Sequence, residues 1–383
     1  MKKYIFTNRG NDTTTSETVC VIAFCIFTFS FLFFYQSDIL TMEQHILSGG
    51  LTKYNKTIGS IIITALLYLL HLGLDEATGK CVRYPALTYL PSAILLAMLT
   101  DVNPDIEYGY DLGKWSWILP LFLIIYGIVL YYAANRIDSS DSESNMNHYQ
   151  QISVNLLILL CTFLCVGCLS NSNRTFHKRM EIDNLIAQHK FKDALAVETM
   201  PTDNDSNITM LRAFALAKES MLGDKLFEYR PKGGSDALLP YKRTKCLIAS
   251  NNEIYNFIAK PVKQQLRPMK YLVWMKNHRL AKKPLRDYML CGLLLDKQID
   301  LFVKELMNEK NIELKKLPKH YKEALILYNH IRTTPIVTYN NVIMDADYLD
   351  MQTIMRSSYN KAMTKAKAEK SFGNTYWYYF FYE

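Results

Sequence analysis

The segment Trp115–Ala134 reads WSWILPLFLIIYGIVLYYAA and contains no charged residue over its 20 positions. At about 1.5 Å per residue, a helix of this length crosses the hydrocarbon core of a bilayer, which is about 30 Å thick. Two tryptophans near its start and two tyrosines near its end suit the aromatic belts of a membrane–water interface. The segment therefore predicts a transmembrane helix.

Four more uncharged apolar runs accompany this segment within the first 170 residues. They are Val19–Tyr35, Thr57–Leu74, Ala86–Thr100 and Ile152–Leu169. Inside hydrocarbon the backbone must satisfy its own hydrogen bonds, so each run is expected to be helical. The third run is the weakest of the five, because it has only 15 residues and contains Pro91.

The two halves of the chain differ in charge. Residues 1–170 hold 9 Lys/Arg and 13 Asp/Glu, whereas residues 171–383 hold 35 and 23. The net charge therefore changes from −4 to +12, and the two values sum to the +8 of the whole chain. A hydrophobic half followed by a basic half predicts a membrane domain over residues 1–170 and a water-soluble domain over residues 171–383.

Basic residues in the loops predict the orientation of the five spans. With the N-terminus inside, the inner segments hold six Lys/Arg and the outer loops hold three, which places the soluble domain outside the cytoplasm. Counting the three basic residues that directly follow the fifth run would make the numbers equal. If Ala86–Thr100 does not span, the soluble domain moves to the inside.

The soluble half is predicted to consist of paired amphipathic helices. Met180–Val197 has the pattern of two short helices with a turn near His189–Phe191. Met210–Phe227 repeats this plan, and Gly223 is expected to end a helix there. Further helices are predicted at Leu285–Leu295, Ile299–Met307, Tyr321–Ile331 and Tyr348–Lys370. Because small residues of one helix face large ones of the next, we predict an all-α fold with a tetratricopeptide-like helical-repeat domain.

Four stretches of the chain together resemble a known family. They are RYPALTYLPSAILLAMLTD at 83–101, NRTFH at 173–177, LPKHYKEAL at 317–325 and FGNTYWY at 372–378. The chain resembles an uncharacterised family of bacterial multi-pass membrane proteins with tetratricopeptide-like tails, and the likeness covers most of its length. The resemblance supports only this architecture and a bacterial setting. We expect the chain in the bacterial inner (cytoplasmic) membrane, and the loop charges put the C-terminal domain on the periplasmic or extracytoplasmic side. No catalytic residue is carried over, because the family has no established activity.

The loop after the third run carries acidic side chains at alternating positions, namely Asp101, Asp105, Glu107 and Asp111. Oxygen ligands with this spacing occur in calcium loops, which also need Gly at the sixth position and Glu at the twelfth. The sequence has Ile106 and Leu112 there, so no metal site is predicted. We interpret the segment as a solvated acidic loop and keep its four carboxylates as the candidates for acid–base catalysis.

Residues 242–297 are strongly basic, with 13 Lys/Arg against three acidic residues. The candidate binding face consists of Lys242, Arg243, Lys245, Arg267, Lys270, Trp274, Arg279, Lys282 and Lys283. On a membrane-tethered domain such a face suits anionic lipid or an acidic polymer. Nucleic acid is not expected as a partner, because no nucleic-acid module is recognisable. The competing interpretation is a solvated face of the helical repeats.

Two further features of the soluble half are open at this stage. Cys246 and Cys291 are its only cysteines, and whether they pair in a disulfide cannot be decided from their spacing. Residues 376–382 read YWYYFFY, and seven adjacent aromatic side chains must be covered, either by the domain or by the membrane interface. We favour docking on the domain, because helical repeats need a closed end.

These features favour a membrane-anchored interaction or scaffold protein of the bacterial cell envelope. Its spans would contact the lipid bilayer and its helical repeats a protein partner. The alternative is a membrane enzyme or transporter that acts on a lipid-linked or polymeric envelope substrate through the Asp101–Asp111 loop. No phosphate-binding glycine loop, nucleophile elbow or zinc-ligand spacing occurs in the sequence, so an enzyme is the less favoured class and no cofactor is predicted.

Overall fold

The computed structural model describes residues 11–77, 84–103, 113–135, 148–260, 266–308, 312–357 and 360–383. The chain divides into two compact units, Met1–Asn173 and Arg174–Glu383, close to the predicted boundary between residues 170 and 171. Within the described ranges the regular elements are all helices, and the only β-type pairings are two isolated bridges, Tyr241–Thr244 and Ala259–Ala281. The predicted all-α class is therefore confirmed for this part of the chain.

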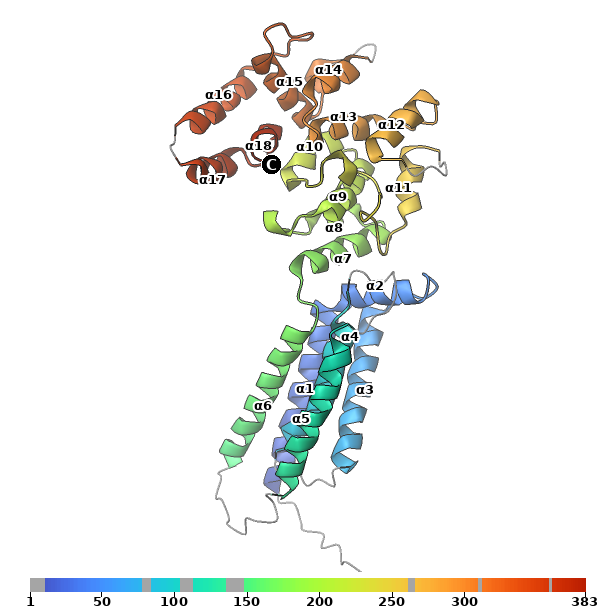
Figure 1. The fold of residues 1–383 in the computed structure, drawn as a ribbon, viewed down its shortest axis with the longest axis vertical. Coiled ribbons are helices and arrows are strands. Elements are labelled where there is room, and N and C mark those ends of the chain that lie inside the picture. Colours follow the sequence, from blue (N-terminus) through green and yellow to red (C-terminus); the bar gives the residue numbers. More distant parts are fainter. Residues whose placement is uncertain are drawn as a thin grey trace, which may run out of the picture. The chain divides into compact units, whose positions relative to one another are not determined.

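The first unit contains six α-helices and two short helices of other types in its described part (Figure 1). They are α1 (Asn11–Ser30), the π-helix η1 (Phe31–Tyr35), α2 (Ser37–Leu47), α3 (Lys56–Ala77), the 3₁₀-helix η2 (Pro85–Tyr89), α4 (Leu90–Thr100), α5 (Trp115–Asn135) and α6 (His148–Leu169). All five predicted apolar runs are thus helical.

Three of the described helical stretches are long and apolar enough to cross a membrane, namely Thr15–Tyr35, Lys56–Glu76 and Tyr149–Leu169. Two shorter apolar stretches, Pro85–Thr100 and Trp115–Val129, correspond to the third and fourth predicted spans. The third run is short for a physical reason: its first five residues form the 3₁₀-helix η2, and Pro91 starts the 11-residue α4. The prediction of five full spans is therefore supported by length and composition for three.

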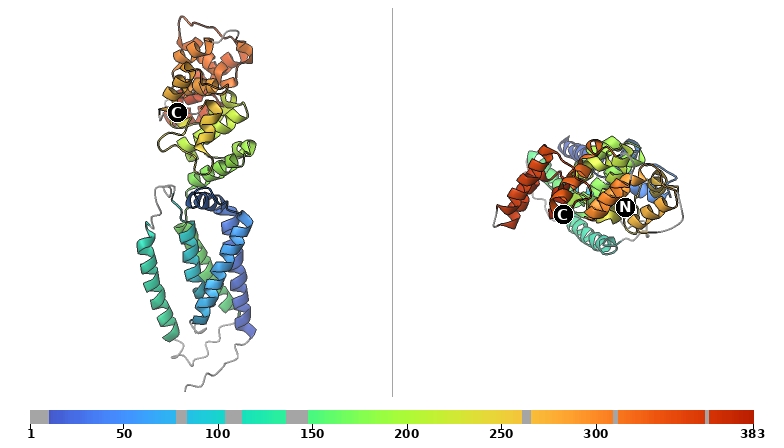
Figure 2. Two further views of the ribbon diagram at one scale, coloured as in Figure 1. Left: turned by 90° about the vertical axis from the view of Figure 1, so that its right-hand side faces the viewer. Right: turned by 90° about the horizontal axis from the view of Figure 1, so that it is seen from above.

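Helices α1, α3, α4 and α6 of this unit pack against one another (Figure 2). Their shared core includes Phe24, Tyr89, Leu96 and Leu159, each of which is buried. Polar side chains also join the helices. The Asn155 amide of α6 accepts the N–H of Ala86 at 3.2 Å and donates to Ser16 Oγ at 3.2 Å. Such bonds between helices satisfy polar groups that an apolar interior cannot hydrate.

The second unit consists of short helices joined by tight turns. They are α7 (Arg174–Ala187), α8 (Phe191–Ala196), η4 (Pro201–Asp203), α9 (Ser206–Lys218), α10 (Leu222–Lys225), η5 (Leu226–Tyr229), η6 (Gly234–Ala237), α11 (Asn251–Ile258), α12 (Pro268–Asn277), α13 (Leu285–Leu295), α14 (Ile299–Met307), η7 (Leu314–Lys316), α15 (Lys319–Ile331), α16 (Val342–Arg356), α17 (Lys361–Phe372) and α18 (Tyr376–Tyr382). One continuous apolar core runs from α7 to α18.

Three helix pairs of this unit share the same turn. His189, Ser220 and Lys297 have positive φ values of 58°, 58° and 57°. Each donates its N–H to the carbonyl three residues back, and the next residue donates to the carbonyl five residues back, which is the Schellman motif. The following helices α8, α10 and α14 each begin two residues after the turn residue. The predicted turn near His189–Phe191 is confirmed, but the positions 189, 220 and 297 follow no constant period.

Two predictions about helix ends in this unit were wrong. Gly223 does not end a helix, because α9 stops at Lys218 and Gly223 lies inside α10. A Cβ atom at Gly223 would lie 2.8 Å from Tyr321 Cζ, so the glycine allows the close approach of α15. The predicted helix Tyr348–Lys370 is two helices, α16 and α17. Asn360 starts the second of them, since its side chain accepts the N–H of Ala362 at 2.9 Å.

The aromatic C-terminal segment forms α18, which packs on α15 and α17. The side chains of Tyr376, Trp377, Tyr378 and Tyr379 are all buried. Trp377 Nε1 donates to the Glu323 carbonyl at 2.7 Å, and Tyr379 Oη donates to the Leu295 carbonyl at 2.9 Å. The predicted docking of this segment on its own domain is therefore confirmed.

We predict that fragment 174–383 has a mostly helical circular dichroism spectrum and that Trp377→Ala destabilises it by about 3–5 kcal/mol, because the change leaves a cavity in the core. The thermal midpoint should fall by about 10 °C in a domain of this size. Phe381→Ala is the matched control. Its ring is only half-buried, so its effect should be smaller. An unchanged midpoint for Trp377→Ala would contradict the docking of α18.

The shared turn predicts opposite effects for two substitutions at one exposed position. Ser220→Gly should stabilise fragment 174–383 by about 1 kcal/mol, because glycine adopts positive φ without steric cost. Ser220→Val should destabilise it by roughly 1–2 kcal/mol, because a β-branched side chain is strained there. Urea unfolding of both variants measures the difference. Equal stabilities would show that residue 220 does not hold the left-handed conformation.

Candidate functional site

The basic residues predicted as a binding face lie in three segments. Lys242, Arg243 and Lys245 belong to the loop before α11, Arg267, Lys270 and Trp274 to the start and body of α12, and Arg279, Lys282 and Lys283 to the connection between α12 and α13. Seven of the nine are exposed, whereas Lys245 and Trp274 are half-buried. The Lys282 ammonium donates to the Asn256 carbonyl, and the Trp274 ring stacks on His278 with centroids 3.9 Å apart. These contacts anchor parts of the face to the domain.

Two of the nine residues share a cavity of about 260 Å³. Arg267 and Lys270 line it together with Ser235, Asp236 and Asp296. The Arg267 guanidinium pairs with the Asp236 carboxylate at 2.7 Å, and Ser235 donates from its N–H and its hydroxyl to the Asp296 carboxylate. The acidic and basic groups of this cavity therefore largely neutralise each other.

The structure describes only one of the four carboxylates of the predicted acidic loop. Asp105, Glu107 and Asp111 lie outside the described residues. Asp101 follows α4, and its Oδ2 accepts the Trp115 indole N–H at 2.8 Å and lies 3.0 Å from Lys114 Nζ. The carboxylate therefore ties the end of α4 to the start of α5, which is a structural use of this side chain.

The two cysteines of the second unit do not pair. Cys246 and Cys291 are both free and buried. Burial raises the pKa of both thiols, so neither is a ready thiolate nucleophile. Cys291 Sγ instead lies 3.5 Å from the hydroxyl of Tyr321 within the core.

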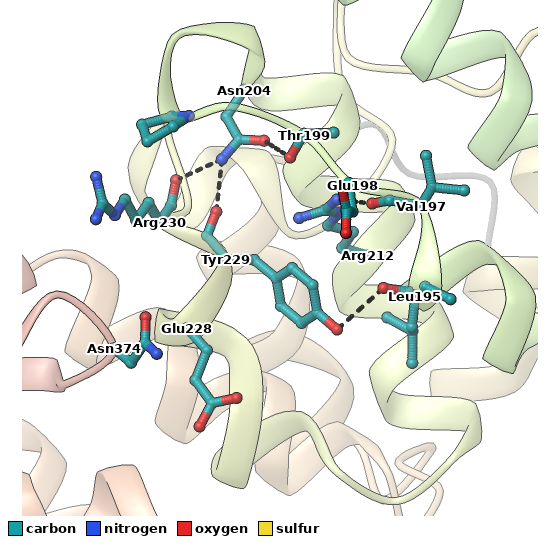
Figure 3. A pocket seen from close by; sticks show the side chains of 12 residues that line it. Leu195, Val197, Glu198, Thr199, Asn204, Arg212, Glu228, Tyr229, Arg230 and Asn374 are labelled. Carbon is teal, nitrogen blue, oxygen red and sulfur yellow. Dashed lines mark hydrogen bonds between the residues drawn. The ribbon is translucent and has the colours of Figure 1, made fainter.

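A cavity of about 390 Å³ lies between α8, η4, α9 and η5, with Asn374 at its edge (Figure 3). Its walls are held by hydrogen bonds. The Asn204 amide donates to the Tyr229 carbonyl at 2.6 Å and accepts from Thr199 Oγ1 at 3.1 Å. Tyr229 Oη donates to the Leu195 carbonyl at 3.2 Å. The cavity is therefore bounded by side chains whose positions are fixed, as small-molecule sites usually are.

Arg212 of α9 is the charged side chain buried in this cavity, with 4% of its surface exposed. Figure 3 shows its guanidinium directed toward the end of α8, where Nη2 donates to the Val197 carbonyl at 2.8 Å. The same guanidinium lies 4.3 Å from the centre of the Tyr229 ring. Its Nε is buried without a hydrogen-bond partner. Burial lowers the pKa of Arg212 to about 10, and the neighbouring Tyr229 offsets only part of that change.

The cavity continues toward the C-terminal segment. A second cavity of about 210 Å³ shares Pro201 and Arg230 with the first, and it is also lined by Lys232, Glu369 and Tyr378. The Arg230 guanidinium pairs with the Glu369 carboxylate of α17. The two cavities therefore meet at Pro201 and Arg230.

Sequence reasoning did not identify the Arg212 cavity. Its residues come from segments between positions 195 and 230 and from position 374. Arg212 stands among alanine, leucine and phenylalanine in the run MLRAFALA, and a charged residue in the middle of an apolar helix was the one signal that could have drawn attention to it.

Comparison with known proteins gives a family for the chain but no function. No curated protein and no solved structure matches it. The sequence model of one family of unknown function matches residues 108–258 and 263–383, which include α5, α6 and every helix named above in the second unit. This match covers well over half of the chain, and the protein belongs to the family of unknown function DUF6057.

Proposed function

We propose that this protein is a membrane-anchored interaction or scaffold protein of a bacterial cell envelope. In this proposal the apolar helices of the first unit lie in the inner membrane. The second unit is a tetratricopeptide-like domain on the extracytoplasmic side that binds a protein partner.

The observation that carries the anchoring is the exposure of apolar side chains on long helices. Ile61 and Leu66 of α3 and Leu157 and Leu164 of α6 are more than half exposed. Apolar surface in water costs about 25 cal/mol per Å², and hydrocarbon removes this cost. Helices of more than 20 residues with such faces are long enough to cross the bilayer. The three span-length stretches support membrane residence on the same grounds.

The interaction role is supported by the surface of α16 and α17. Val342 and Ile343 at the start of α16 are 86% and 74% exposed, and Leu349 and Met363 are also exposed. Only Tyr348 and Met351 of α16 are buried among its described side chains. Apolar side chains gathered on one helix pair are typical of protein-binding surfaces. Helical pairs stacked on a common core also provide the extended surface that such proteins use.

Fractionation and fusion reporters test the anchoring and the side. The full chain should stay in the membrane pellet after an alkaline carbonate wash, whereas fragment 174–383 should stay in the supernatant. A reporter that is active only outside the cytoplasm should be active when fused after Glu383. Extraction of the full chain would refute the anchor. Activity of a cytoplasmic reporter at the same point would place the domain inside and weaken the case for Pro85–Thr100 as a span.

Site-specific photocrosslinking tests the interaction role in intact cells. A photoreactive residue at Ile343 should give a discrete adduct, whereas the same residue at Lys192, which is exposed on α8, should give none. Changing both Val342 and Leu349 to Ser should weaken the adduct, because the apolar contact is lost. No adduct at Ile343, or identical adducts at both positions, would contradict binding at α16.

A further inference from the structure

The Arg212 cavity contains a buried positive charge without a counterion. No carboxylate of the described residues pairs with Arg212. Its guanidinium donates a hydrogen bond to the Val197 carbonyl and lies over the Tyr229 ring. Nε has no hydrogen-bond partner among the described residues. A buried charge is costly unless it is paired and hydrogen-bonded. The arrangement therefore lacks an anion.

The domain shows how a buried arginine is compensated elsewhere. Arg179 of α7 is also buried, and its Nη2 donates to the Lys245 carbonyl at 2.9 Å. The fully buried Asp183 lies on the same helix. Burial raises the pKa of this carboxyl, and three backbone N–H bonds and the Arg179 guanidinium oppose the rise. Arg179 thus has a carboxylate neighbour inside the protein, whereas Arg212 borders a cavity.

We propose that the cavity binds a carboxylate-bearing ligand, and that the ligand's carboxylate pairs with the Arg212 guanidinium. A planar guanidinium matches a carboxylate through two parallel N–H···O bonds. The side chains of Leu195, Val197 and Pro201 line the same cavity and would contact an apolar body of the ligand. A volume of about 390 Å³ falls in the range of small-molecule sites.

The acidic groups of the lining favour a singly charged anion. Glu198 and Glu228 both line the cavity, and the second already pairs with Lys319 Nζ at 2.8 Å. One carboxylate neutralises the single uncompensated guanidinium. A phosphate dianion would leave an excess negative charge near Glu198, which is destabilising. Inorganic phosphate should therefore bind more weakly than a carboxylate.

Calorimetric titration of the full chain in detergent tests the proposal. The probes are N-acetyl-leucine, the tripeptide N-acetyl-Ala-Ala-Leu, the carboxamide form of each, and inorganic phosphate. We expect at least one carboxylate probe to bind, and its carboxamide to bind at least about tenfold more weakly. Tighter binding of the tripeptide would identify a peptide C-terminus as the source of the carboxylate. Tighter binding of N-acetyl-leucine would identify a small free acid.

Two variants assign the binding to this cavity. Arg212→Met keeps an unbranched apolar stem and removes the charged guanidinium, so carboxylate binding should fall by at least about tenfold. Glu198→Gln changes an exposed side chain, so it should leave the helical spectrum intact and strengthen carboxylate binding severalfold. Equal affinity for carboxylates and carboxamides, no binding of any carboxylate at millimolar concentration, or unchanged affinity in Glu198→Gln would overturn the proposal. The membrane anchor and the α16 surface do not depend on this outcome.

Discussion

The packing of the second unit depends on the hydrogen bonds that Glu323 makes to the start of α18. Glu323 lies in α15 with 2% of its surface exposed, and its carboxylate accepts the Tyr376 backbone N–H at 2.7 Å and contacts His320 Nδ1 at 2.8 Å. A carboxylate taken out of water requires such partners, because an unpaired one costs several kcal/mol or more. The carbonyl of the same residue accepts the Trp377 indole N–H. One residue therefore binds the start of α18 through both its side chain and its backbone.

Docking of α18 has consequences beyond the C-terminus. Asn374, which precedes α18, borders the Arg212 cavity, and its carbonyl accepts from Lys319 Nζ at 3.1 Å. Lys319 also pairs with Glu228 of η5, another residue of the cavity wall. Arg230, which directly follows η5, pairs with Glu369 and so joins this segment to α17. The C-terminal segment thus completes the core and contributes Asn374 to the wall of the Arg212 cavity.

The parts of this fold that could be predicted from the sequence are those with a local cause. Apolar runs define the helices of the first unit, and amphipathic patterns define the helices of the second. The prediction of one unbroken helix over Tyr348–Lys370 was wrong, because Asn360 caps the start of a second helix. The helical pattern of the surrounding residues outweighed the signal of this single asparagine. The shared turns of the helix pairs carry His, Ser and Lys where glycine would have marked them.

The candidate site could not be predicted because its chemistry depends on contacts between distant residues. A buried arginine and a solvated arginine look the same in a sequence, and only the packing of α8 and η5 around α9 distinguishes Arg212. The converse applies to Asp101, whose carboxylate suggested catalysis but is engaged by Lys114 and Trp115. The basic residues of 242–297 were recognised by composition, and their role in binding is still a prediction.

Hydrogen–deuterium exchange of the full chain in detergent, compared with its Glu323→Gln variant, tests most directly whether Glu323 holds α18 in place. A glutamine is nearly the same size but lacks the charge that strengthens the bond to the Tyr376 N–H. If the account is correct, the amides of Tyr376–Tyr382 exchange as slowly as those of the α13 core in the natural chain and much faster in the variant. Fast exchange of these amides in the natural chain, or equal protection in both proteins, would contradict it.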